Sequence, residues 1–236
     1  MRLPQRYDEL WSAAIGKIRT GAIEIDPVLA AGTPDPRRGL TLIARPSLKV
    51  RRSVVAFLRE LRRFEPDQHY YAPSDLHLTI LSLFTATVDH KWFFKRKEKY
   101  VAAVESVLRR ATPIRIEFRG VTASPGAILI QGFPENEMLK NVRDALRRQL
   151  RLDGLSEGLD ARYRLETAHI TVARFRARLR DGECFANALE QSRRLSFGTT
   201  TIKSLSLVRT DWYMTRRTLQ ILKRYRLPRT GTRSGN

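Results

Sequence analysis

Cysteine, clustered metal ligands and long apolar runs are scarce or absent in this chain of 236 residues. Its single cysteine, Cys184, excludes an internal disulfide framework, fits a reducing compartment and is expected to be a small, inert core residue. The four histidines are not clustered in the sequence, so we expect no metal site and no cofactor. There is no signal-peptide-like run at the N-terminus, and no stretch reaches the roughly 18 to 20 apolar residues of a membrane span. These absences predict a cytoplasmic protein with no membrane partner.

Acidic residues are also scarce relative to basic ones. The 24 Asp and Glu residues stand against 44 Lys and Arg residues, which gives a formal net charge of +20. Such a charge concentrates anions near the protein, so it favours a phosphate-bearing partner, RNA above all. A high-arginine proteome or a simple need for solubility is the alternative explanation. The hydrophobic share of 42% is sufficient for a folded core. The sequence does not determine the oligomeric state, and a monomer is favoured.

Hydrophobic periodicity predicts a mixture of helices and strands, and therefore an α+β fold with antiparallel sheets. The expected helices are 6–20, Leu48–Phe64, Trp92–Arg110, Glu135–Arg151 and Glu183–Arg193. The expected strands are Leu40–Ser47, Leu76–Phe84, Ile114–Val121, Gly126–Phe133, Leu165–Phe175 and two closing strands within 201–210 and 214–227, joined at Asp211–Tyr213.

The domain organisation follows from where this pattern begins and ends. Residues 1–39 form an N-terminal helix and a connector rich in Pro and Gly. Residues 40–228 form the main α+β domain. Residues 229–236, "RTGTRSGN", are expected to be a disordered tail.

Two short segments share a pattern that is unusual for buried strands. "SDLHLTILSLF" contains His77 and Thr79, and "ETAHITVARF" contains His169 and Thr171 in the same relative places. Because side chains alternate between the two faces of a strand, each histidine shares a face with its threonine, while aliphatic residues occupy the other face. A pair of buried, hydrogen-bonded histidines is the alternative interpretation. The repetition in a chain with only four histidines favours a functional pair.

The chemistry of phosphodiester cleavage requires two such groups. One base activates the nucleophile and one acid protonates the leaving oxygen, and two imidazoles with ordinary pKa values near 6.5 can divide these roles near pH 7. Threonine hydroxyls can donate hydrogen bonds to the non-bridging phosphate oxygens, where negative charge gathers in the transition state. No metal is needed for this chemistry.

The segments "HLTI" and "HITV" resemble the signature of the two-histidine phosphoesterase superfamily, which includes the 2′,3′-cyclic phosphodiesterases once called 2′-5′ RNA ligases. The resemblance implies a bilobal fold in which two antiparallel sheets flank a central cleft and helices cover the outer faces. It also implies that His77 and His169 are the acid–base pair and that Thr79 and Thr171 bind the phosphate. Which histidine is the acid remains open.

Other residues near the motifs are candidates for substrate contacts. Tyr70 and Tyr71 could stack on a base or simply pack at the strand entrance. Arg174 and Arg176 follow the second motif closely enough to reach a phosphate, and Tyr213, beside Trp212, could lie at the cleft rim. The remaining histidines, His69 and His90, are expected at the surface.

These inferences predict a metal-independent phosphodiesterase that acts on RNA ends or nucleotides, by opening 2′,3′-cyclic phosphates or cleaving 2′-5′ linkages. RNA ligation would be the same reaction reversed. Two alternatives stay open: a non-catalytic RNA-binding module of the same fold, and an enzyme specialised for ADP-ribose or cyclic oligonucleotides.

Overall fold

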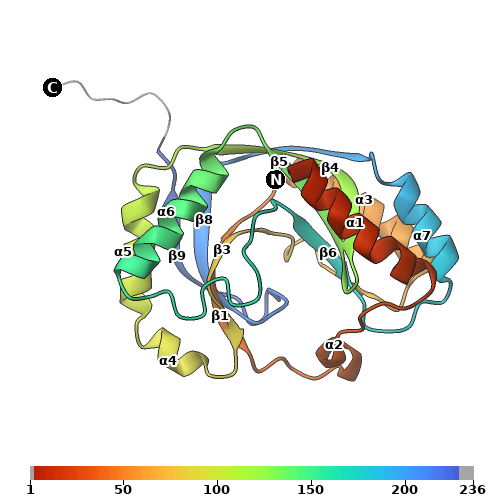
Figure 1. Ribbon diagram of the computed structural model, residues 1–236, viewed down its shortest axis with the longest axis horizontal. Helices are drawn as coiled ribbons and strands as arrows, with labels where there is room; N and C mark the ends of the chain where they lie inside the picture. The colour runs from red at the N-terminus through yellow and green to blue at the C-terminus, as the bar shows by residue number, and fades with distance from the viewer. Residues whose placement is uncertain (1–2, 229–236) are drawn as a thin grey trace.

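Two antiparallel sheets form the framework of the computed structural model, which describes residues 3–228 (Figure 1). The expected tail at 229–236 lies outside the described residues. The first sheet has four strands, in the order β3 (Leu78–Thr87), β1 (Arg38–Ala44), β8 (Ser204–Thr210) and β9 (Gln220–Arg226). The second has five, in the order β2 (His69–Tyr70), β6 (Ile170–Arg174), β5 (Ala127–Pro134), β4 (Ile114–Ser124) and β7 (Ser196–Ile202).

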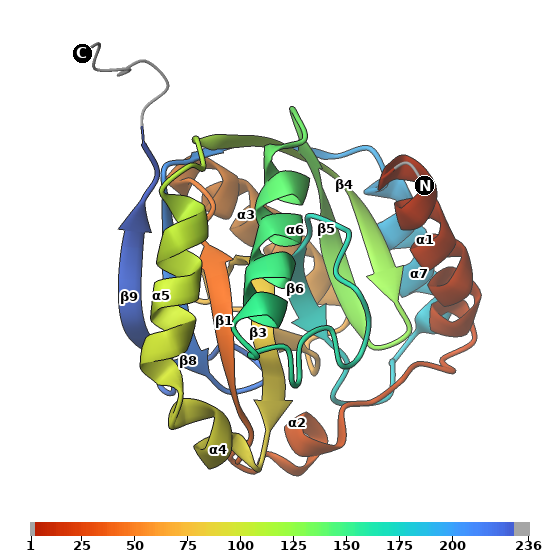
Figure 2. The ribbon, with the colours of Figure 1, turned by 60° about the vertical axis from the view of Figure 1, so that its left-hand side comes forward.

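Helices pack against both sheets. The helices beside the first sheet are α4 (His90–Phe94), α5 (Lys97–Leu108) and α6 (Met138–Leu152), of which α5 and α6 are seen from the front in Figure 2. The helices beside the second sheet are α1 (Leu3–Arg19), α3 (Leu48–Phe64) and α7 (Gly182–Gln191). A further short helix, α2 (Pro27–Ala31), lies in the N-terminal connector. The predicted α+β fold with two antiparallel sheets is confirmed.

Burial follows the sequence pattern closely in the longer elements. In α3 the buried side chains recur at helical spacing, and they are Val50, Val54, Phe57, Leu58 and Leu61. In β4 the alternation of Ile114, Ile116 and Phe118 with charged residues places the apolar side chains in the core. Helix α6 is different, because Arg143 and Arg147 are buried along with its apolar side chains.

Several predicted element boundaries differ from those of the structure. The expected helix Trp92–Arg110 is interrupted at Lys95–Arg96, between α4 and α5. The expected strand 201–210 is divided at Lys203, and its two parts, β7 and β8, belong to different sheets. Both histidine motifs begin one residue before their strands, because β3 starts at Leu78 and β6 at Ile170.

The N-terminal helix packs on the outer side of the second sheet, against β4 and α7. Its Tyr7 is buried, and the Tyr7 hydroxyl donates to the Gly132 carbonyl (3.1 Å). The same oxygen accepts from the backbone N–H groups of Gly132 and Ala168, both at 3.1 Å. Helix α1 therefore supports the segment that leads directly into His169.

Candidate active site

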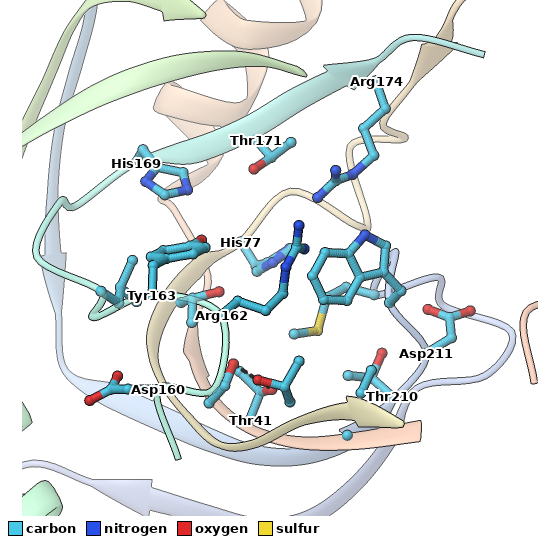
Figure 3. A pocket seen from close by; sticks show the side chains of 18 of the residues that line it. Thr41, His77, Asp160, Arg162, Tyr163, His169, Thr171, Arg174, Thr210 and Asp211 are labelled. Atoms are coloured by element: carbon cyan, nitrogen blue, oxygen red, sulfur yellow. Dashed lines mark hydrogen bonds between the residues drawn. The ribbon is translucent and has the colours of Figure 1, made fainter. Parts of the chain in front are cut away.

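A cleft lies between the two sheets and contains both histidine motifs (Figure 3). His77 and His169, each one residue before its strand, line the cleft together with Thr79 of β3 and Thr171 of β6. The opposite faces of both motifs are apolar and buried, as alternation predicts; their side chains are Leu76, Leu78, Ile80, Ala168, Ile170 and Val172.

His77 is held by the backbone immediately before it. Its Nδ1 lies 2.7 Å from the carbonyl oxygen of Asp75. A carbonyl oxygen can only accept, so Nδ1 carries the proton and, in the neutral ring, Nε2 is left as a proton acceptor. The residue as a whole is 8% exposed.

The Nδ1 atom of His169 faces a hydroxyl group, whereas that of His77 faces a carbonyl group. Its Nδ1 lies 2.8 Å from Oγ1 of Thr167. A hydroxyl can donate or accept, so this contact fixes the orientation of the ring and permits either neutral tautomer. In both motifs the Nδ1 atom is thus occupied by a partner two residues earlier.

Burial lowers the basicity of both rings. It lowers the pKa of His77 to about 4, and the nearby cations Arg45 and Arg174 act in the same direction while the Asp75 carbonyl opposes them. Burial likewise lowers the pKa of His169 to about 3, with further lowering by Arg143, His77 and Arg174. In the free protein at neutral pH both imidazoles are therefore neutral bases.

Hydroxyl groups line the face of the cleft that the first sheet provides. Thr41 and Ser82, on adjacent strands, have their side-chain oxygens 3.3 Å apart. Oγ1 of Thr210, on β8, is buried and has no hydrogen-bond partner within residues 3–228. The cleft therefore offers donors and acceptors beyond the two motif threonines.

Cationic and aromatic side chains line another part of the cleft. Nε of Arg174 donates to the hydroxyl of Tyr71 (3.0 Å), which fixes the guanidinium near Thr171 (Figure 3). Arg162 lies over the Trp212 ring, with 4.4 Å from its Cζ to the ring centroid, and Arg174 approaches the same ring at 5.6 Å. The two guanidinium groups give this part of the cleft affinity for an anion.

Three residues proposed as substrate contacts do not line this cleft. Tyr70 is buried, and its hydroxyl donates to the Glu65 carbonyl (2.8 Å). Arg176 is exposed, with Nε donating to the Asp67 carbonyl (2.7 Å). The hydroxyl of Tyr213 donates to Oδ1 of Asp26 (2.6 Å), and it is the adjacent Trp212 that lines the cleft. The Tyr70 and Tyr213 side chains are buried in the surrounding structure, and Arg176 lies at the surface.

Two expectations about burial were wrong. His69 is half-buried in β2, with its ring centroid 5.2 Å from that of Tyr71, so it is not a loop residue at the surface. Cys184 is exposed and not in the core, because it occupies the solvent side of the first turn of α7.

Sequence reasoning missed several cleft residues because they carry no local signal. Arg162 and Tyr163 lie in an irregular segment, "DARYR", that folds over the cleft. Bonds from Arg147 to the two Asp160 carboxylate oxygens (2.6 and 3.1 Å) hold this segment in place. An aspartate with a positive φ of 52° next to a buried helix arginine is recognisable only once the chain is folded.

Within residues 3–228, no group of three or more His, Cys, Asp or Glu side chains has the geometry to hold a metal ion. Over the same residues, no helix is both long and apolar enough to span a membrane.

Comparison with known proteins places these features in a family. The sequence profile of the 2′-5′ RNA ligase superfamily matches residues 50–212. The crystal structure of TT0787 of Thermus thermophilus superimposes with a TM-score of 0.58 at 19% identity, covering 83% of this chain and 100% of that one. A structure described as a phosphoesterase gives 0.55 at 14% identity, covering 81% and 98%.

E. coli LigT complexed with 3′-AMP gives a TM-score of 0.50 at 14% identity, covering 82% of this chain and 99% of that one. At these identities the structures establish the fold alone. A search of curated proteins found no significant match.

Proposed function

This chain belongs to the 2′-5′ RNA ligase superfamily, and from that premise we propose that it is a phosphodiesterase in which His77 and His169 form an acid–base pair. The observation that carries the proposal is the arrangement of the two rings. Each comes from a different sheet, each has its Nδ1 atom occupied by a protein oxygen, and each lines the same cleft. Two imidazoles on either side of a bound phosphate suit in-line displacement at phosphorus.

The proposed hydrolysis of a 2′,3′-cyclic phosphate involves two proton transfers. Nε2 of one histidine takes a proton from water as the water oxygen bonds to phosphorus. The bond from phosphorus to one ribose oxygen breaks, and that oxygen takes a proton from the other histidine. The products are a phosphomonoester and a free ribose hydroxyl, and the rings regain their starting states by exchanging protons with solvent. Cleavage of a 2′-5′ linkage uses the same two groups, and ligation is the reverse.

We assign the acid to His77 and the base to His169. The Asp75 carbonyl accepts from Nδ1–H of His77 and so favours the doubly protonated ring, whereas His169 has only a hydroxyl partner and lies near the Arg143 cation. His77 therefore takes up an additional proton more easily than His169 does.

Thr79, Thr171 and Arg174 are proposed to bind the non-bridging phosphate oxygens. Their side chains line the cleft beside the histidines, and the tether from Arg174 to Tyr71 holds the guanidinium in place before the substrate binds. Donors that are fixed in advance stabilise developing charge without reorganising, which is typically worth about 10² to 10³ in rate per donor.

The substrate class follows from the surroundings of the phosphate site. The cleft adds hydroxyls and an indole to the phosphate-binding groups, which suits a nucleotide. The net charge of +20 favours a polyanion, so RNA ends carrying a cyclic phosphate are the proposed substrates. LigT, a structural neighbour, was crystallised with the nucleotide 3′-AMP.

The test is a substrate panel assayed in EDTA with the wild-type protein and its H77A, H169A and H90A variants. The panel contains 2′,3′-cyclic nucleotides, an RNA with a cyclic phosphate end, a 2′-5′ dinucleotide and an ADP-ribose phosphodiester. We expect turnover in EDTA that falls about 10²- to 10⁴-fold in each of H77A and H169A. H90A is the control, because His90 lies in α4, outside the cleft.

The outcomes separate the proposal from its alternatives. RNA binding without turnover of any panel member would identify a non-catalytic binding module. Turnover of the ADP-ribose compound alone would identify the specialised enzyme. Turnover that H77A leaves unchanged would refute the acid–base pair.

A further inference from the structure

A single buried arginine connects the two histidine motifs. Arg143 lies on α6 and is 3% exposed. Its guanidinium donates to two carbonyls of the first motif, Ile80 (from Nε, 2.8 Å) and Thr79 (from Nη2, 3.0 Å). It also donates to two carbonyls that precede His169, Glu166 (from Nη1, 3.0 Å) and Thr167 (from Nη2, 2.9 Å). One side chain thus joins the main chains of both motifs.

This arrangement differs from an ordinary buried ion pair. The next inward-facing arginine on the same helix, Arg147, is equally buried but pairs with the Asp160 carboxylate. Within residues 3–228, the four hydrogen bonds that Arg143 donates all end on main-chain carbonyl oxygens. Arg143 forms no ion pair with a carboxylate within residues 3–228, and burying such a cation is costly, which indicates that its contacts serve a purpose other than stability alone.

The geometry between the motifs needs such a connection. β3 and β6 belong to different sheets, so no ladder of hydrogen bonds between them sets the distance from His77 to His169. The guanidinium group is planar, and its N–H groups form a rigid fork, so acceptors bound to it are fixed relative to one another. The bound carbonyls lie within three residues of each histidine.

We propose that Arg143 is a positioning residue that sets the separation and orientation of His77 and His169, an inference that rests on the function proposed above. It does not touch the substrate; it acts through the backbone of both motifs. Loss of the fork lets the two lobes shift relative to each other, and a misplacement of about 1 Å in a reacting group can cost about 10²-fold in rate.

The experiment compares R143K, R143M and R143A with the wild-type protein. Lysine keeps the charge, but its single nitrogen has three donors and cannot bridge four carbonyls. We expect R143K and R143M to lower kcat about 10²-fold on a 2′,3′-cyclic nucleotide, with KM changed less than threefold, because the phosphate-binding side chains remain. Guanidinium chloride at tens of millimolar, but not sodium chloride, is expected to restore part of the kcat of R143A, since Arg143 also borders an outer groove open to solvent.

A second readout separates position from charge. The charged groups that act on His169 are Arg143, His77 and Arg174. Removing the Arg143 cation raises the pKa of His169. In a histidine NMR titration, the pKa of His169 should therefore be higher in R143M than in the wild-type protein, and unchanged in R143K. A loss of kcat shared by both variants, with the pKa change confined to R143M, identifies the geometric role.

A third readout does not depend on turnover. Hydrogen exchange should increase together in the Thr79–Ile80 and Glu166–Thr167 segments of R143K, with no change in β9. The stability control is L150A, which removes a buried side chain two turns further along α6. It should lower the Tm while leaving kcat per folded molecule unchanged.

Two results would overturn the inference. One is a folded R143K protein whose kcat lies within twofold of the wild-type value. The other is a loss in every variant that matches the lost folded fraction, as in L150A. If the wild-type protein turns over no panel substrate, the function proposed above fails, and the exchange measurement still decides whether Arg143 couples the motifs.

Discussion

Anion binding in the histidine cleft should require the protein to take up a proton. With the pKa of His77 lowered to about 4, the imidazolium form accounts for about one molecule in a thousand at pH 7. A phosphate or sulfate oxygen facing Nε2 of His77 favours the protonated ring, because the anion places a negative charge directly beside that ring. If only this form binds, affinity should rise about tenfold, or roughly 1.4 kcal/mol, for each pH unit lowered from 7 to 5.

Sulfate is the appropriate probe, because its own charge is constant over this pH range. Calorimetric titration at constant ionic strength should show affinity increasing about 100-fold between pH 7 and pH 5. Repeating the titration in buffers of different ionisation enthalpy should show uptake of about one proton per sulfate. Arg143, Arg174 and Arg45 stay protonated throughout, so they contribute attraction but no pH dependence.

The control and the refuting result use the same assay. His69 also has a pKa lowered by burial, and its ring lies 5.2 Å from Tyr71, so H69A is measured beside H77A. H77A should abolish most of the proton uptake, and H69A should leave it intact. Sulfate binding that is independent of pH and releases or absorbs no proton would refute the acid role assigned to His77.

Three further predictions test the cleft. R174K should raise KM about tenfold or more in steady-state kinetics, because lysine cannot keep the bond to Tyr71 while offering a planar fork to phosphate. R176K is the control, because Arg176 lies outside the cleft, and it should change KM less than twofold. G132A should lower both Tm and kcat, because a Cβ at Gly132 would lie 1.9 Å from the Ala168 carbonyl oxygen and displace the segment before His169. A G132A protein with the wild-type kcat would contradict this expectation. W212L should weaken binding of nucleotides while leaving sulfate binding within threefold, and equal losses for both probes would count against stacking on the indole.

The part of the site that the sequence predicted is the part that depends on local alternation. A strand places residues two apart on one face, so His77 could be paired with Thr79, and His169 with Thr171, without knowing the fold. The apolar residues between them were predicted to be buried, and they are. That the two motifs meet in one cleft came from the family resemblance and from no property of the residues themselves.

The part that could not be predicted depends on contacts between distant segments. The residue pairs Tyr70–Tyr71 and Arg174–Arg176 look alike in the sequence, yet one member of each lines the cleft and the other does not. For the arginines, the difference is set by partners about 100 residues away, the Tyr71 hydroxyl and the Asp67 carbonyl. The same holds for Arg143, which has the appearance of a surface residue on a basic helix.

In the proposed mechanism, the electrostatics of the cleft give the histidines and the arginines separate roles. The arginines near the site attract anions at any physiological pH, and their positive charge adds to burial, the larger cause, in lowering the pKa values of both imidazoles. A ring that is already protonated could not act as the base, and two neutral rings could not supply the acid. We propose that the negative charge of the bound phosphate resolves this conflict, because it raises the pKa of one ring, which then takes up a proton from solvent only when a substrate is in place. In the proposed mechanism the acid therefore forms only when the substrate binds, and His77, whose Nδ1 faces a carbonyl oxygen, is the ring that we propose receives the proton.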